Sequence, residues 1–120
     1  MNEPVTLRVD REVRDGVVVL TLSGELLVTN RDALRRSAES EIEDGRSGIV
    51  IAVDRLTHID MSGLALLVHL SGRCSERGAR LVVAGLNRDY QEMRQHLFLD
   101  EALVFSDDVE GAVAAVSRPV

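Results

Sequence analysis

The sequence predicts a single α/β domain: a mixed sheet of four to five strands, with an N-terminal β-hairpin followed by alternating strands and helices. Two runs rich in β-branched residues flank an Asp-Gly pair, apolar runs of strand length follow, and the segments between them repeat apolar residues at helical spacing. Such alternation is typical of parallel strands joined by right-handed crossovers. We therefore expect one domain over residues 1–120, with its core at about residues 5–116.

The hairpin is the first expected element. Residues 5–13 alternate loosely between apolar and polar side chains, and residues 17–22 are rich in β-branched side chains. Asp15-Gly16 lies between the two runs, and Gly supplies the positive φ that a tight primed turn requires. An antiparallel pair should therefore open the fold.

A helix is expected next, capped by Thr29 or Asn30 and closed by Asp44-Gly45. Its apolar stripe consists of Leu34, Ala38 and Ile42. The continuous apolar run at 48–53 then predicts a central strand that is covered on both faces and ends near Asp54, with a short turn after it.

The second half of the chain continues the alternation. A helix that stops at Gly78 carries its stripe at Leu64, Leu67, Val68, Ser71 and Cys74. A strand over 81–84 precedes a helix capped at Asn87, with Tyr90, Met93 or Arg94, and Leu97 on one face. Val104-Phe105 is a candidate edge strand, and Asp107 or Asp108 caps a last helix. The inward face of that helix consists of Val109, Ala112, Val113 and Val116.

The composition excludes several classes of protein. All 14 basic residues are Arg, which excludes enzymes that need a Lys ammonium group for a phosphate loop or a Schiff base. The net charge of −6 should repel nucleic acid, so we expect no nucleic-acid partner. Apolar runs of about five residues are far shorter than the roughly 20 that cross a bilayer, so we expect no membrane insertion. A lone cysteine and the absence of a signal peptide predict a cytoplasmic protein.

Residues 53–64 carry the most information about function. Asp60 and Ser62 follow a buried strand at the point where a helix begins, which places the Ser hydroxyl near unpaired backbone N–H groups. That geometry suits a phosphate, whereas the simpler interpretation is that Asp60 or Ser62 only caps the helix.

This segment resembles the signature of STAS domains, the family of bacterial anti-sigma-factor antagonists, which reads Asp-Leu-x-x-Val-x-x-Ile-Asp-Ser-Ser-Gly-Leu after an apolar strand. Ser62 matches the family's phosphorylated Ser, and Asp60 matches its Asp. Three further segments match in order: Leu22 to Leu26 resembles Ser-Gly-Glu-Leu, Gly78 to Gly85 resembles Gly-Gly-x-Leu-x-Leu, and Leu99 to Leu103 resembles Leu-Asp-x-x-Leu. The resemblance spans roughly Val5 to Val116.

The resemblance implies a partner switch controlled by phosphorylation. Unphosphorylated, the chain would bind an anti-sigma factor that is also a serine kinase; phosphorylated on Ser62, it would be released, and a PP2C-type phosphatase would reset it. The expected partner-binding residues are Glu25, Asp60, Met61, Ser62 and Gly63. The chain is expected to be a monomer or a weak homodimer, with no cofactor, no metal and no enzymatic activity. The alternative is a STAS scaffold or accessory subunit of a signalling assembly or a membrane transporter.

Three positions depart from the family pattern. Met61 stands where the family has Ser, Thr or Ala, and its long thioether would change the surface that a kinase recognises. Leu27 replaces a common Asp, and Phe98 replaces a common Gly; we expect these two to affect details of packing.

Other sites are disfavoured by the residues around them. Ser62 lacks the Gly-x-Ser-x-Gly context of a hydrolase nucleophile, and Asp54 lacks the Lys of a receiver domain. The residues 85–89 lack the glycines of a dinucleotide loop. No metal-ligand spacing joins His58, His69, His96 and Cys74, so we expect the histidines at the surface or an interface and Cys74 in the core.

Overall fold

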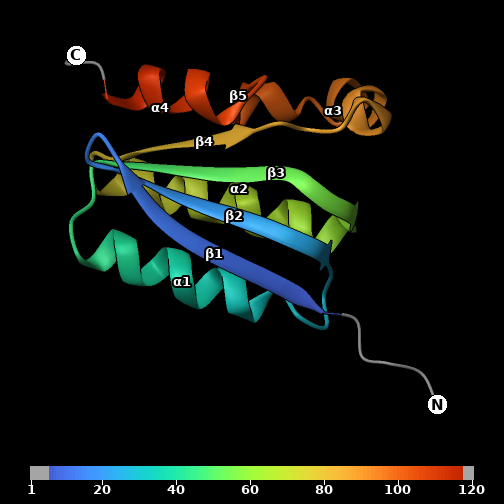
Figure 1. Ribbon diagram of the computed structural model, residues 1–120. Helices are drawn as coiled ribbons and strands as arrows, with labels where there is room; N and C mark the ends of the chain where they lie inside the picture. Colours follow the sequence, from blue (N-terminus) through green and yellow to red (C-terminus); the bar gives the residue numbers. More distant parts are fainter. Residues whose placement is uncertain (1–5, 118–120) are drawn as a thin grey trace.

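A sheet of five strands in the order β1-β2-β3-β4-β5 forms the middle layer of the computed structural model, which describes residues 6–117 (Figure 1). The strands are β1 (Leu7–Arg14), β2 (Val17–Leu26), β3 (Gly48–Ile59), β4 (Arg80–Ala84) and β5 (Val104–Ser106). β1 and β2 are antiparallel, and every later neighbour in the sheet is parallel. The predicted mixed sheet and N-terminal hairpin are confirmed.

Helices cover both faces of this sheet (Figure 1). They are α1 (Asp32–Glu43), α2 (Met61–Glu76), α3 (Gln91–His96) and α4 (Val109–Ser117), with short 3₁₀ turns η1 (Arg88–Tyr90) and η2 (Leu99–Glu101) on either side of α3. α1 and α2 lie together on one face, and α4 packs on β2, β3 and β4 from the other. The crossovers that the alternation predicts are therefore present.

The turn between β1 and β2 has the conformation that Asp-Gly predicts. Asp15 has a φ of 49° and Gly16 a φ of 80°, so both central residues are left-handed, as a type I′ turn requires. This twist matches that of the two strands and fixes their register, in which Arg14 pairs with Val17.

Alternation along the strands divides the buried apolar side chains between two cores. In β3, Ile49 and Ile51 join the larger core under α1 and α2, whereas Val50 and Ala52 join the smaller core under α4. The stripe predicted for α1, at Leu34, Ala38 and Ile42, is fully buried. Cys74 is also buried in the larger core, as expected.

β3 does not end near Asp54 as the sequence suggested, but continues to Ile59. Its second half pairs with the end of β2, where Glu25 lies opposite His58 and Leu26 opposite Ile59, after register shifts in β2. The sequence signal was weak because the buried residues of this half, Leu56 and Ile59, are three apart rather than two. The extension carries the strand directly to Asp60.

Two other local expectations are wrong. Neither Thr29 nor Asn30 caps α1: Arg31 holds the N-cap position without a side-chain bond, and Asn30 uses its side chain to accept from the amide of Leu27. Leu97 does not face the core but is exposed, because α3 ends at His96.

The caps predicted in the second half of the chain are present. Asn87 caps the 3₁₀ turn η1, and Asp108 caps α4 by accepting from the Gly111 amide.

Ion pairs hold α1 in place from both sides. The buried carboxylate of Glu41 accepts from Arg11 of β1 and from Arg46, and the hydrogen bond from Arg11 is the main reason that its pKa is lowered. Glu39 pairs with Arg73 of α2, with 3.0 Å between Oε2 and Nη2, and this contact lowers the pKa of Glu39. The C-terminal half of α1 is thereby fixed against β1 and against the last turn of α2.

Candidate partner-binding site

Asp60 is the N-cap of α2 and also binds the loop between β2 and α1. Its Oδ1 accepts from the amide of Gly63 at 2.8 Å, and its Oδ2 accepts from the amide of Val28 at 3.0 Å. The bond from Gly63 is the largest cause of the lowered pKa of Asp60, and the bond from Val28 lowers it further. The capping role predicted for Asp60 is confirmed, and the carboxylate is ionised at neutral pH.

The loop that follows β2 is held against the start of α2 by backbone contacts as well. The Asp60 amide donates to the carbonyl of Leu26 at 3.1 Å, and the Arg31 amide donates to Leu27 at 2.9 Å. Asn30 closes this loop by accepting from the Leu27 amide at 2.9 Å and donating to the Glu25 carbonyl at 2.9 Å. The loop after β2 and the start of α2 therefore form one continuous surface.

Gly63 is buried where α2 meets the end of β2. A Cβ at this position would lie 2.9 Å from Ile59 Cγ1, Leu26 Cγ and the Leu26 carbonyl oxygen. The position therefore requires Gly for close packing, and Gly63 supports the surface from below.

The Ser62 hydroxyl is turned inward. Its Oγ is buried and has no hydrogen-bond partner among the residues that the structure describes, so it does not bond to the backbone N–H groups near which the sequence placed it. A buried hydroxyl without a partner costs about 1–3 kcal/mol. The Ser62 carbonyl accepts from Arg31 Nη1 at 3.3 Å.

Two apolar side chains flank Asp60 on the outside of the molecule. Val28 is 61% exposed and Met61 is 60% exposed. Met61 therefore lies at the surface and is not part of the core. The buried apolar residues around this turn are Leu56, Ile59 and Leu64. Sequence reasoning missed Val28 because the loop that carries it is 32 residues away from Asp60.

Tyr90 of η1 contacts the same region from its other side. Its hydroxyl accepts from the amide of Ile59 at 3.2 Å and lies 3.4 Å from His58 Nδ1. The remaining predicted site residue, Glu25, is half-buried at the end of β2, in register with exposed His58. The structure therefore brings Glu25, Asp60, Met61, Ser62 and Gly63 to one corner of the fold.

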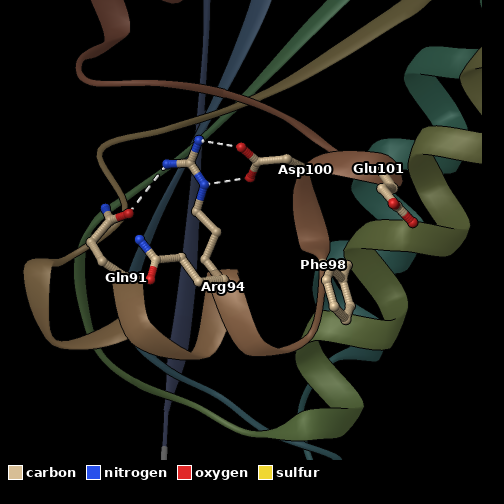
Figure 2. A pocket seen from close by; sticks show the side chains of 6 residues that line it. Gln91, Arg94, Phe98, Asp100 and Glu101 are labelled. Carbon is tan, nitrogen blue, oxygen red and sulfur yellow. Dashed lines mark hydrogen bonds and ion pairs between the residues drawn. The ribbon is translucent and has the colours of Figure 1, made fainter.

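A separate hollow lies beside α3 and is lined in part by Arg94, Phe98 and Asp100 (Figure 2). Arg94 donates to Asp100 Oδ2 at 2.9 Å and to Gln91 at 3.2 Å, and its guanidinium stacks on Phe105 with 4.2 Å to the ring centre. The donors of Arg94 are thus engaged within the fold.

Phe98 departs from the expectation that it affects packing. It is 68% exposed and has a left-handed backbone, with a φ of 52°. This conformation costs a non-Gly residue about 1–2 kcal/mol, which explains why Gly suits the position.

Other candidate residues occupy separate places. His58, His69 and His96 are exposed, and within residues 6–117 no group of three His, Cys, Asp or Glu side chains is arranged to hold a metal ion. Burial raises the pKa of the Cys74 thiol to about 11, so this thiol is protonated at neutral pH. None of the helices described is long and apolar enough to cross a membrane.

The chain belongs to the STAS domain family, whose model matches residues 8–112. This match confirms the resemblance that the segment around Asp60 and Ser62 suggested. It covers most of the sheet, α1, α2 and the loops that form the site.

Three solved structures are similar in fold. An anti-sigma factor antagonist from Mycobacterium paratuberculosis has a TM-score of 0.86 and 19% identity, covering 98% of this chain and 100% of its own. The phosphorylated form of the Bacillus cell fate determinant SpoIIAA has a TM-score of 0.69 and 20% identity, covering 92% of this chain and 99% of its own. The murine anion transporter Solute Carrier 26 family member A9 has a TM-score of 0.70 and 17% identity, covering 84% of this chain and 18% of its own.

The packing at Gly63 generates a direct test of this site. We expect Gly63→Ala to lower the free energy of unfolding by about 1–3 kcal/mol, because the added Cβ overpacks the junction with Leu26. Gly72→Ala, on the same helix with open space around it, should leave stability unchanged or raise it by up to about 1 kcal/mol. Urea denaturation of both variants measures the difference, and equal stabilities would contradict the close packing.

Proposed function

We propose that this chain is an anti-sigma-factor antagonist that works by partner switching. In its unphosphorylated form it binds an anti-sigma factor that is also a serine kinase, and phosphorylation of Ser62 releases it. The observation that carries the proposal is the exposed pair Val28 and Met61 on either side of Asp60, directly beside Ser62. Membership of the STAS family and the fold shared with anti-sigma factor antagonists support the same role.

The surface around Asp60 has the properties of a small docking site. Val28 and Met61 offer apolar area at its centre, and a flexible thioether adapts to the shape of a partner. The hydrogen bonds of Asp60 fix the two loops relative to one another, so little conformational freedom is lost on binding. Such pre-organisation lowers the entropic cost of binding a protein partner.

The chemistry of the switch belongs to the kinase. The kinase transfers the γ-phosphoryl group of ATP to Ser62 Oγ, ADP leaves, and the hydroxyl proton passes to a base of the kinase or to solvent. This chain contributes only the acceptor and the surface that presents it, so we infer that it is not an enzyme. Because Oγ is buried, Ser62 must first rotate outward in the complex.

Phosphorylation weakens the complex by local electrostatics and bulk. The phosphate adds about −1.5 to −2 charges within two residues of the Asp60 carboxylate, at the centre of the contact surface. A loss of about 4 kcal/mol lowers affinity roughly a thousandfold, so no refolding is required. A PP2C-type phosphatase would restore the binding form.

A second role is favoured by one observation, the similar domain within the murine anion transporter. In that case this chain would be a STAS scaffold or an accessory subunit of a transporter or signalling assembly, and Ser62 would receive no phosphate. The same surface could serve either role, because the fold does not determine the partner.

We expect Ser62 to be the one site that the cognate kinase phosphorylates. The chain is incubated with ATP and Mg²⁺ alone, then with the kinase encoded beside its gene, and its intact mass is measured. The wild type should gain one phosphate only with the kinase, and Ser62→Ala should gain none. Phosphate on Ser62→Ala would contradict the assignment, phosphate without the kinase would indicate an enzyme, and no transfer in any reaction would favour the scaffold role.

We also expect Met61→Ala to weaken binding to that kinase, measured by calorimetric titration, while changing the free energy of unfolding by less than about 0.5 kcal/mol. Met61 makes its contribution at the surface, where truncation removes apolar contact with the partner. Val104→Ala is the matched control, because Val104 is also 60% exposed but lies on β5, at the edge of the sheet. Equal affinities of the two variants would show that Met61 is outside the interface.

A further inference from the structure

Arg31 is one of the arginines that appear in no ion pair within residues 6–117. Seven arginines form ion pairs with carboxylates: Arg8, Arg11, Arg14, Arg35, Arg46, Arg73 and Arg94. Arg31 is half-buried and has no carboxylate within ion-pair distance among the residues described. Its Nη1 instead donates to the neutral carbonyl of Ser62 at 3.3 Å. A full positive charge therefore lies against the proposed phosphorylation site. The nearby Asp32 carboxylate, whose pKa is lowered mainly by Arg35 and also by Arg31, forms its ion pair with Arg35.

The position of Arg31 is fixed by the loop that Asp60 binds. The Arg31 amide donates to the carbonyl of Leu27 at 2.9 Å, and the side chain of the neighbouring Asn30 bonds to Glu25 and Leu27 at the start of the same loop. These bonds fix the backbone of Arg31, and the bond from Nη1 to the Ser62 carbonyl places its guanidinium beside Ser62. It is available before any phosphate is attached.

We propose that Arg31 binds the phosphate when Ser62 is phosphorylated; this inference rests on the proposed function. The carbonyl and Oγ belong to the same residue, so a phosphate on Oγ comes within reach of a guanidinium that already contacts the carbonyl. The planar guanidinium exchanges a neutral acceptor for a doubly charged one, to which it can donate two parallel hydrogen bonds. Arg31 thereby holds the phosphate on the surface that the partner must contact.

Arg31 also offsets the other charges near the phosphate. The two other titratable groups near the phosphate are Asp60 and His58. The Asp60 carboxylate caps the same helix and repels the phosphate, and the His58 ring is exposed at the end of β3. Asp60 and His58 are present in every variant below, so their effects cancel in the comparison. What remains is the contribution of Arg31.

The test uses phosphoserine introduced at position 62 during translation, which requires no kinase. The second pKa of the phosphate, ordinarily about 6, is measured by ³¹P NMR titration. We expect Arg31→Gln to raise this pKa by roughly half a unit, since the cation that favours the dianion is lost. Arg31→Lys should give a smaller rise, because it keeps the charge but not the planar fork.

Arg35→Gln is the matched control. It also removes one positive charge, but Arg35 lies one turn further along α1 and pairs with Asp32 at 3.1 Å. It should leave the phosphate pKa almost unchanged. Equal pKa values in the parent and both Arg31 variants, or an equal shift in Arg35→Gln, would overturn the proposal. Failure of the switch is a separate result: phosphorylated chain that binds the kinase as tightly as unphosphorylated chain contradicts the proposed function and leaves the pKa comparison intact.

Discussion

The carboxylate of Asp60 connects the loop after β2 to the start of α2, and the rest of the site depends on this connection. One oxygen caps α2 through the Gly63 amide, and the other holds the Val28 amide of the loop after β2. A single short side chain can do both only because β3 continues to Ile59 and pairs with the end of β2. Without that extension, the two loops would have no common support, and Val28, Met61 and Ser62 would not form one surface.

Local chemistry in the sequence predicts the elements of the fold whose signals are short-range. Asp15-Gly16 predicts its turn because both residues tolerate a positive φ, and Asp60 predicts the start of α2 because an acidic cap satisfies a free amide. The second half of β3 could not be predicted in this way. It is a strand because it pairs with β2, which is a contact between residues more than 30 positions apart.

The parts of the site that the sequence hides are also tertiary. The motif indicates Asp60, Met61, Ser62 and Gly63, but neither Val28 nor Arg31 matches any pattern, since both reach Asp60 or Ser62 from the opposite loop. The burial of the Ser62 hydroxyl without a hydrogen-bond partner could not be predicted from its position at the start of a helix. The motif thus identifies the helix start that carries Ser62, and the loop after β2 places Val28 and Arg31 beside it.

Amide hydrogen exchange in Asp60→Ala tests most directly whether one carboxylate holds both loops. If it does, the amides of Val28 and Gly63 should both exchange at least about tenfold faster than in the wild type, because both lose their acceptor. The amide of Val50, in the buried centre of β3, reports the loss of overall stability, and its exchange should accelerate less than that of Val28 and Gly63. Unchanged protection of Val28, with Gly63 alone exchanging faster, would show that Asp60 is only a helix cap and would contradict the account.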